Sequence, residues 1–409
     1  MPDYAKFTED MIKTHTILIP DMLPVHFKLL ISIFEASGYK MELLQNDSRA
    51  VVDEGLKNVH NDACYPALLV IGQFMDALKS GKYDVNKTAL LITQTGGGCR
   101  ASNYIHMLRK CVNNNFPQVP VVSLNFSGLE KDSAFRIKPL MFLKMLYAVL
   151  YGDLLMSLHN QCRAYEITPG SSGKVLAKWQ RILGKIFKTG SNEYLKTKKI
   201  YRKILDDFAA VKVSSEKKIK VGIVGEIYVK YSPLANNHLE DFLISEGCEP
   251  VVPALMEFIL YVIAGTINDA EIYDKKTKKT TAFSVAYKLI HSKQKELIRV
   301  MEEHGRFDPP HDFEHVRHLA DKYINQGVVM GEGWLIPAEM AALAESGVEN
   351  IICAQPFGCL PNHIVAKGMA RAIKNGYPNA NIVAIDYDPG ATRVNQENRI
   401  KLMLANARR

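Results

Sequence analysis

Short apolar runs alternate with helix-like stretches along the first third of the chain. The apolar runs are five or six residues long and occupy residues 15–20, 40–44, 89–93 and 119–124. Stretches with helical periodicity separate them, at residues 25–37, 64–82 and 100–114. Strands that are spaced by helices are typical of parallel βαβ units with right-handed crossovers. We therefore expect a first α/β domain over residues 1–133.

The middle of the chain has a different pattern, and the strand–helix alternation then resumes. Residues 134–209 read as almost entirely helical, which predicts a helical bridge over residues 134–217. Further apolar runs follow at residues 218–226, 250–253, 350–354 and 381–386, with a long helical insertion near 256–326. The predicted fold class is α/β, with two Rossmann- or flavodoxin-like parallel-sheet domains, the second over residues 218–409, joined by the helical segment.

The positive charge of the chain is concentrated in the predicted bridge. The formal net charge is +8, and residues 174–220 hold fourteen Lys or Arg residues against four acidic ones. A smaller basic cluster consists of Lys275, Lys276, Lys278 and Lys279. This pattern is typical of a solvated helix pair, or of a docking face for an acidic partner or a phosphate group. No nucleic-acid-binding motif accompanies the charge, so we expect no nucleic-acid partner.

The hydropathy pattern also indicates the cellular compartment of the protein. No continuous apolar stretch reaches the roughly 18–20 residues that cross a bilayer, and the N-terminus does not resemble a signal peptide. We therefore expect a cytoplasmic protein without a membrane partner. In a reducing compartment its seven cysteines should be free thiols, metal ligands or redox groups rather than disulfides.

Three of these cysteines occupy equivalent positions in the sequence. Cys64, Cys99 and Cys359 each lie in a turn rich in Gly or Pro, just before or within the first turn of a predicted helix. Ligands bind at the carboxyl edge of open α/β sheets, which is where such turns lie. A helix N-terminus stabilises a thiolate, the form that binds iron, so we expect the thiolate to be favoured here.

The glycines before Cys99 add backbone donors to this hypothesis. Gly96, Gly97 and Gly98 would let backbone N–H groups approach a cluster or a phosphate closely. From the residues alone, a metal or cluster site, thiol redox chemistry and structural cysteines all stay open. Cys353, near the end of a predicted strand, is a less favoured fourth ligand. We interpret Cys111, Cys162 and Cys248 as structural.

Polar residues beside these turns are candidates for further roles. Glu226 and Tyr228 follow a predicted strand and could contact substrate, or could simply belong to a helix cap at Asn237. Arg100 could offset the charge of a cluster, and Asn362 could donate a hydrogen bond to one or cap a helix. His363 is the third candidate catalytic residue, beside Glu226 and Tyr228.

A group of histidines farther along the chain suggests a metal site less strongly. The group consists of His304, His311, His315 and His318. No His-Glu-x-x-His motif is present, so a zinc-protease site is excluded. A solvated helix start is the favoured interpretation, with His311 and His315 on one face if residues 312–324 are helical.

Five segments resemble a known family. They read NDACYPALLVIGQ, TQTGGGCRASNYI, VGIVGEIYVKYSPLANNHLEDFL, CAQPFGCLPNHIVAKGM and AIDYDPGATRVNQENRIKLML. The chain is similar, from about residue 14 to residue 404, to the activase-related branch of the 2-hydroxyacyl-CoA dehydratase family, which includes dehydratase subunits and double-cubane cluster proteins.

This resemblance implies an iron–sulfur cluster, of the [4Fe–4S] or double-cubane type, on three cysteines from both lobes. The ligands would be Cys64, Cys99 and Cys359. It further implies an ATP-dependent iron–sulfur activase as electron donor and an acyl-CoA or small-molecule substrate. Pairing with a second subunit, identical or different, is left open.

The sequence departs from the longer family members in one respect. It contains neither an Asp-x-Gly-Ser/Thr motif nor a P-loop, so ATP would be used by the partner. Dehydratase activity, low-potential reduction, a non-catalytic regulatory or assembly role, and a zinc or thiol protein of the same fold all stay open.

Overall fold

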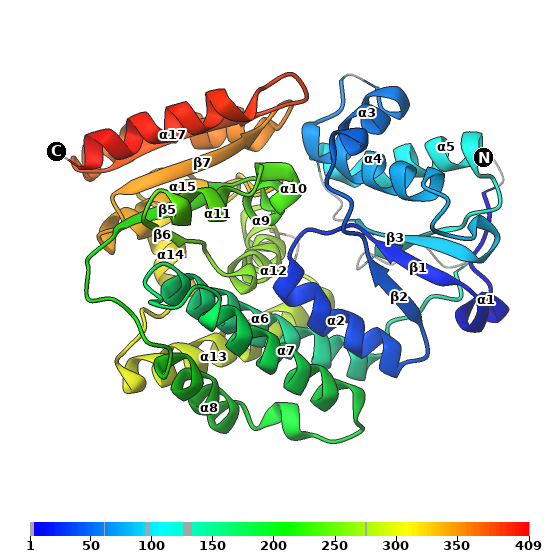
Figure 1. Ribbon diagram of the computed structural model, residues 1–409, viewed down its shortest axis with the longest axis horizontal. Helices are drawn as coiled ribbons and strands as arrows, with labels where there is room; N and C mark the ends of the chain where they lie inside the picture. The colour runs from blue at the N-terminus through cyan, green and yellow to red at the C-terminus, as the bar shows by residue number, and fades with distance from the viewer. Residues whose placement is uncertain (1–3, 61, 95–97, 126–132, 275, 409) are drawn as a thin grey trace.

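A computed structural model describes residues 4–60, 62–94, 98–125, 133–274 and 276–408. Within these residues the chain forms two four-stranded, all-parallel sheets flanked by helices, which confirms the predicted fold class (Figure 1). The strand order is β2-β1-β3-β4 in the first sheet and β6-β5-β7-β8 in the second. The two sheets therefore share one topology, with the first strand of each inside the sheet.

The first sheet lies in the lobe at the right of Figure 1. Its strands are β1 (Thr16–Ile19), β2 (Lys40–Leu43), β3 (Thr88–Gln94) and β4 (Val121–Asn125). Its helices are α1 (Glu9–Thr14), α2 (Pro24–Ala36), α3 (Arg49–Asn58), α4 (Tyr65–Lys79) and α5 (Tyr104–Asn115), with short 3₁₀ turns η1 (Val85–Lys87) and η2 (Arg100–Asn103). All four apolar runs of the first third are strands, because each is flanked by turn residues and helices.

The second sheet lies in the lobe at the upper left of Figure 1. Its strands are β5 (Ile219–Gly225), β6 (Cys248–Val251), β7 (Asn350–Pro356) and β8 (Asn381–Tyr387). Its helices are α9 (Ile227–Tyr231), α10 (Pro233–Asn236), α11 (Leu239–Ser245), α15 (Leu335–Glu345), α16 (Lys367–Gly376) and α17 (Arg393–Ala407), with the π-helical turn η4 (Pro361–Ala366). Every residue of β7 is buried, as expected for an inner strand covered on both faces.

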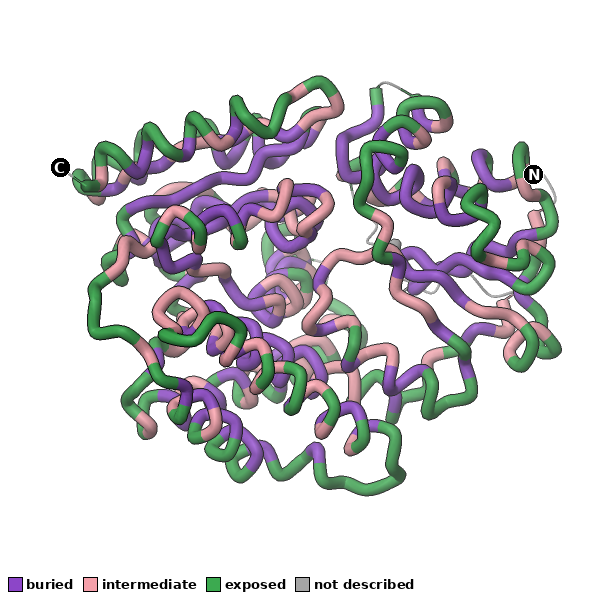
Figure 2. Tube along the Cα trace, in the orientation of Figure 1, coloured by how far each residue is buried: buried purple, intermediate pink, exposed green. Residues whose placement is uncertain are grey.

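The predicted bridge and the predicted insertion pack together as one helical body below the two sheets (Figure 1). The bridge forms α6 (Pro139–Arg163), α7 (Ser171–Lys188), η3 (Glu193–Leu195) and α8 (Thr197–Ala209). The insertion forms α12 (Leu255–Ile272), α13 (Lys278–His304) and α14 (Phe313–Ala320). Helix α13 packs on α8, and α2 of the first lobe packs on α6 and α7. The basic faces of α7 and α8 are turned outward (Figure 2).

Two short helices, α10 and α11, follow one another closely at residues 233–245. Asn237 and His238 both have left-handed backbones, with φ of 55° and 57°, and end α10 before α11 begins. Asn237 is thus the C-cap residue of α10 and not an N-cap. Its side chain donates to the Gln396 side-chain oxygen at 2.7 Å.

Helix α6 is the one described helix that is long and apolar enough to cross a membrane by composition. Two thirds of its apolar window, 67%, is buried inside the protein. Its apolar side chains, among them Tyr151, Leu154 and Leu155, belong to the core of the helical body. The length and composition of α6 are therefore those of a central core helix.

Candidate functional site

Cys64, Cys99 and Cys359 line one cavity between the two lobes, with a volume of about 230 Å³. The first two come from the first lobe and Cys359 from the second. The lobes touch directly at this point, because the Tyr65 backbone N–H donates to the Phe357 carbonyl at 2.9 Å. Residues that are up to 295 positions apart in the sequence thus meet at the carboxyl edges of both sheets.

Each of the three cysteines lies where a helix or helical turn begins. Cys64 is the N-cap of α4, and Cys99 is the N-cap of η2, which leads into α5. Cys359 follows β7 and lies two residues before η4. Backbone N–H groups of the following turns, from Ala67, Ala101 and Asn362, point at the three sulfur atoms and favour their charged forms.

Two side chains add hydrogen bonds to these sulfur atoms. The Tyr104 hydroxyl lies 2.7 Å from the Cys64 sulfur. The fully buried Asn362 amide donates to the Cys359 sulfur at 3.1 Å. The thiol of Cys353, which is buried inside β7, donates to the other end of the same amide at 3.3 Å. The Asn362 side chain therefore holds the Cys359 sulfur in place and also bonds to the sulfur of Cys353, which lies within the strand β7.

The expectation of thiolates stabilised by helix ends is wrong for the protein alone. Burial raises the pKa of Cys64 to about 11 and also raises the pKa values of Cys99 and Cys359, despite the backbone donors. The negative charges of Glu226 and Glu332 raise the pKa values of Cys99 and Cys359 further, because they disfavour a negatively charged thiolate nearby. Without metal the cavity therefore holds thiols, and a metal must displace their protons to bind.

Two glutamates form the acidic side of the cavity. Glu226 is the N-cap of α9, and its carboxylate accepts the Val229 backbone N–H at 2.8 Å. Glu332, which precedes α15, accepts the Ile227 backbone N–H at 2.9 Å. Burial and the neighbouring Glu332 raise the pKa of Glu226 to about 8. At neutral pH this carboxyl group holds a proton that it can donate.

Helix α12 and a glycine turn form further walls of the cavity, and the glycine turn lies beside Cys99. Phe258 and Tyr261 of α12 line it, and the Tyr261 hydroxyl donates to the Gly331 carbonyl at 2.8 Å. Gly331 has φ of +57°, and a Cβ atom there would lie 2.7 Å from Pro361 and 3.6 Å from the Cys99 sulfur. Glycine is thus required at this close approach.

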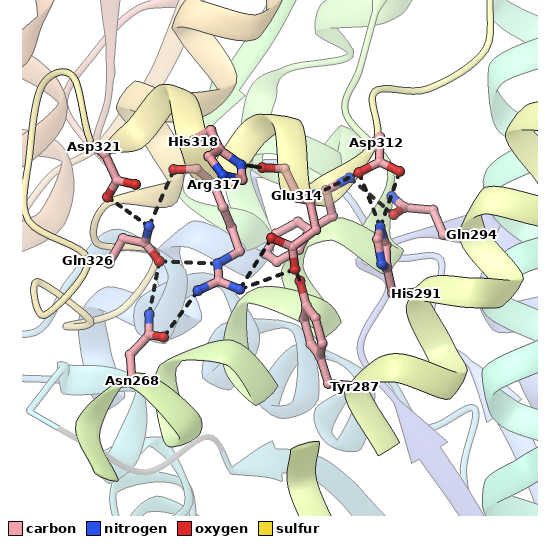
Figure 3. A network of polar contacts seen from close by, with 11 residues as sticks. Asn268, Tyr287, His291, Gln294, Asp312, Glu314, Arg317, His318, Asp321 and Gln326 are labelled. Atoms are coloured by element: carbon pink, nitrogen blue, oxygen red, sulfur yellow. Dashed lines mark hydrogen bonds and ion pairs between the residues drawn. The ribbon is translucent and has the colours of Figure 1, made fainter. Parts of the chain in front are cut away.

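A polar network holds α12 in place from behind (Figure 3). The Arg317 guanidinium of α14 donates to Asn268 of α12 at 3.2 Å and to the Gln326 side chain at 3.1 Å. It also donates to Glu314, which accepts the hydroxyl of Tyr287 on α13. The network therefore joins α12, α13, α14 and the loop that leads to Gly331.

The other predicted site residues lie partly outside the cavity. Arg100 lines it, whereas Gly98 is not among the described residues that do; a Cβ atom at Gly98 would lie 3.2 Å from the Met330 side chain. Tyr228 and His363 are not among the described residues that line it. Tyr228 is a buried residue of α9, and the exposed His363 contacts the Gln355 amide at 3.0 Å. Gly96 and Gly97 lie outside the described residues, as does Lys275.

Within the described ranges, the four histidines are found at separate places: His304 and His311 are half-buried, and His315 and His318 are exposed. His311 precedes α14, which begins at Phe313, so it does not share a helix face with His315. His315 pairs with Glu345, and His304 with Asp206 at 3.6 Å.

Tyr104, Tyr261 and Glu332 are site residues that sequence reasoning missed. The two glycines in the sequence Met-Gly-Glu-Gly at residues 330–333 could have predicted the turn that brings Glu332 to the cavity. Cys111, Cys162 and Cys248 are buried away from the cavity, as structural cysteines would be.

Across the described ranges, no group of three or more His, Cys, Asp or Glu side chains is close enough to hold one metal ion. Comparison with models of known protein families gives no match, and neither does comparison with curated proteins.

Proposed function

We propose that the chain binds an iron–sulfur cluster, of the [4Fe–4S] or double-cubane type, on Cys64, Cys99 and Cys359. It is then a cytoplasmic protein of the 2-hydroxyacyl-CoA dehydratase type. It accepts low-potential electrons from an ATP-dependent iron–sulfur activase and acts on an acyl-CoA or a small molecule. The observation that carries the proposal is the convergence of these three thiols, from both lobes, on one cavity.

The residues around the cavity suit a negatively charged, thiolate-bound cluster. Backbone N–H groups of the three helical turns, the Tyr104 hydroxyl and the Asn362 amide supply hydrogen bonds to sulfur. A cluster bound here would supply single electrons at low potential to a thioester carbonyl.

The remaining walls provide a proton and an apolar shield. Glu226 holds a proton at neutral pH, because its pKa is raised to about 8, and can donate it to a leaving hydroxyl group. Phe258 and Tyr261 of α12 limit water on the opposite side.

The test is the iron and acid-labile sulfide content of protein purified without oxygen. Cys64→Ala, Cys99→Ala and Cys359→Ala should each lose most of the iron, whereas Cys111→Ala, a buried cysteine outside the cavity, should retain it. Iron-free wild-type protein after anaerobic reconstitution, or equal iron in all four variants, would overturn the proposal.

Two rival functions give different results. A zinc or thiol protein of this fold would show no cluster absorbance or EPR signal after reconstitution. A regulatory or assembly partner would bind the activase, yet its cluster would not be reduced when the activase and ATP are added.

A further inference from the structure

A chain of hydrogen bonds joins a buried thiol to one of the proposed cluster ligands. The Cys353 thiol donates to the Asn362 side-chain oxygen at 3.3 Å, and the nitrogen of the same amide donates to the Cys359 sulfur at 3.1 Å. The Asn362 backbone N–H also points at that sulfur. Asn362 thus contacts Cys359 with its main chain and its side chain, and connects it to a second cysteine.

The fold holds the Asn362 amide in one place. Asn362 is the second residue of the π-helical turn η4, and its side chain is fully buried. Pro361, the first residue of that turn, lies against Gly331, where a Cβ atom would be 2.7 Å from the proline ring. π-Helical turns are rare and are found frequently at functional sites. Because the amide is closed off from solvent, the two sulfur atoms take the place of water as its partners.

Cys353 is placed as a hydrogen-bond donor rather than as a metal ligand. It lies inside β7, which pairs with β5 on one side and with β8 on the other. Its side chain is 2% exposed and belongs to an apolar core cluster with Ile336 and Met340 of α15. It is not among the described residues that line the cysteine cavity. The Asn362 amide is therefore its link to the cavity cysteines.

Metal binding at Cys359 fixes the direction of this hydrogen-bond chain. A cysteine that binds iron has lost its proton, so its sulfur can then only accept a hydrogen bond. The amide must present its nitrogen to Cys359 and its oxygen to Cys353, which is the orientation in the structure. The Cys353 thiol satisfies that oxygen by donating to it. Both bonds thus point toward Cys359, and hydrogen bonds in such a chain polarise one another.

We propose that Cys353 is a positioning residue that acts on the cluster through Asn362. Its S–H group orients and polarises the amide, which strengthens the hydrogen bond to the Cys359 sulfur and raises the reduction potential of the bound cluster. Hydrogen bonds to ligand sulfur atoms favour the reduced form, because an added electron increases the negative charge on these atoms.

This role rests on the proposed function, which supplies both the cluster and the electron. One electron passes from the activase to the cluster, and no bond or proton of Cys353, Asn362 or Cys359 is transferred. Cys353 keeps its thiol proton throughout, so the role excludes it as a fourth ligand. The sequence-based hypothesis of a fourth ligand at Cys353 and the positioning role therefore predict different iron contents for Cys353→Ala.

The first test uses the iron-free protein and the infrared S–H stretching band of Cys353. The wild-type spectrum minus that of Cys353→Ala should contain a thiol band that is shifted and intensified by its hydrogen bond. The same subtraction in an Asn362→Leu background should give the band of a free thiol. Thiols outside the chain are present in both members of each pair and cancel. Equal bands in the two backgrounds would overturn the hydrogen-bond chain.

The second test measures the potential of the iron-loaded protein by redox titration followed by EPR. Asn362→Leu should lower the midpoint potential, so that the ratio of reduced to oxidised cluster at a fixed applied potential falls about fivefold. Cys353→Ala should retain its iron and shift the potential in the same direction by less. Cys353→Ser should reverse most of that shift, because a hydroxyl group can donate the same hydrogen bond. Cys162→Ala, the matched control, removes a buried thiol that donates to the Phe208 carbonyl, and should leave the potential unchanged.

A double variant separates an effect through Asn362 from a general effect on the fold. In the Asn362→Leu background, Cys353→Ala should shift the potential no further. Additive shifts, loss of iron in Cys353→Ala, or a wild-type potential in Cys353→Ala would each overturn the role of Cys353 and leave the proposed function intact. Failure of the wild-type protein to bind a cluster would overturn the proposed function and with it the effect on the potential, and the infrared test would still decide whether the hydrogen-bond chain exists.

Discussion

Gly358 lies where the two lobes meet beside the cysteines. Its φ is +73°, and a Cβ atom there would lie 3.1 Å from the Cα of Cys64 and 3.4 Å from the Ala63 carbonyl oxygen. Both neighbours are backbone atoms, which cannot rotate away. Gly358→Ala therefore tests whether the contact between lobes is needed to assemble the site.

The expected cost has two parts. A left-handed backbone costs a non-glycine residue about 1–2 kcal/mol. Overpacking against backbone typically adds about 1–3 kcal/mol, unless the lobes separate to relieve it. We expect Gly358→Ala to lose about 2–5 kcal/mol of unfolding free energy, or to keep stability by opening the lobes and lose iron instead.

The control for backbone strain alone is Gly347→Ala. Gly347 has φ of +84°, and a Cβ there would meet no atom within 4 Å. Urea denaturation should show a loss of about 1–2 kcal/mol for this variant, with full iron content. If Gly358→Ala matches Gly347→Ala in both stability and iron content, the close approach of the lobes is irrelevant to the site.

Three further predictions concern buried charges. Lys230→Met should lower the free energy of unfolding by about 3–5 kcal/mol, because it leaves the buried Glu339 unpaired. The double variant Lys230→Met/Glu339→Leu should recover most of this loss. Equal stability of the single and double variants in urea denaturation would contradict the prediction. Burial lowers the pKa of His159 to about 4 from 6.5, so the unfolded chain binds more protons between these values. Stability should fall as the pH drops from about 6.5 to about 4, by about 3 kcal/mol, and thermal melts of His159→Asn should show a correspondingly smaller dependence. Arg317→Met should cost about 1.5–3 kcal/mol by removing the bonds that hold α12; an unchanged melting temperature would show that the network is dispensable.

The strands were predictable because their signal is local. Each apolar run is flanked by turn residues, and each of the eight predicted runs overlaps a strand of the described chain. The position of the cysteine turns at helix starts followed from the same alternation. Helix α15 was not predicted, although its Ala-rich sequence is a good helix former.

The rest of the site depends on contacts that sequence spacing does not encode. Tyr261 and Glu332 belong to different segments and reach the cavity only because the insertion folds back onto the bridge. The raised pKa values of the cysteines were missed because burial outweighs the helix ends, and burial is a property of the whole fold. Tyr228 was expected at the site because α9 was not foreseen; that helix directs its side chain away from the cavity.

The wall formed by α12 comes from a segment inserted between β6 and β7, whereas the cysteines belong to the turns of the sheets. The residues that form this wall and the cysteines thus belong to different segments of the sequence. Changes in the length or side chains of the insert can remodel what enters the cavity and leave the sulfur-bearing turns untouched.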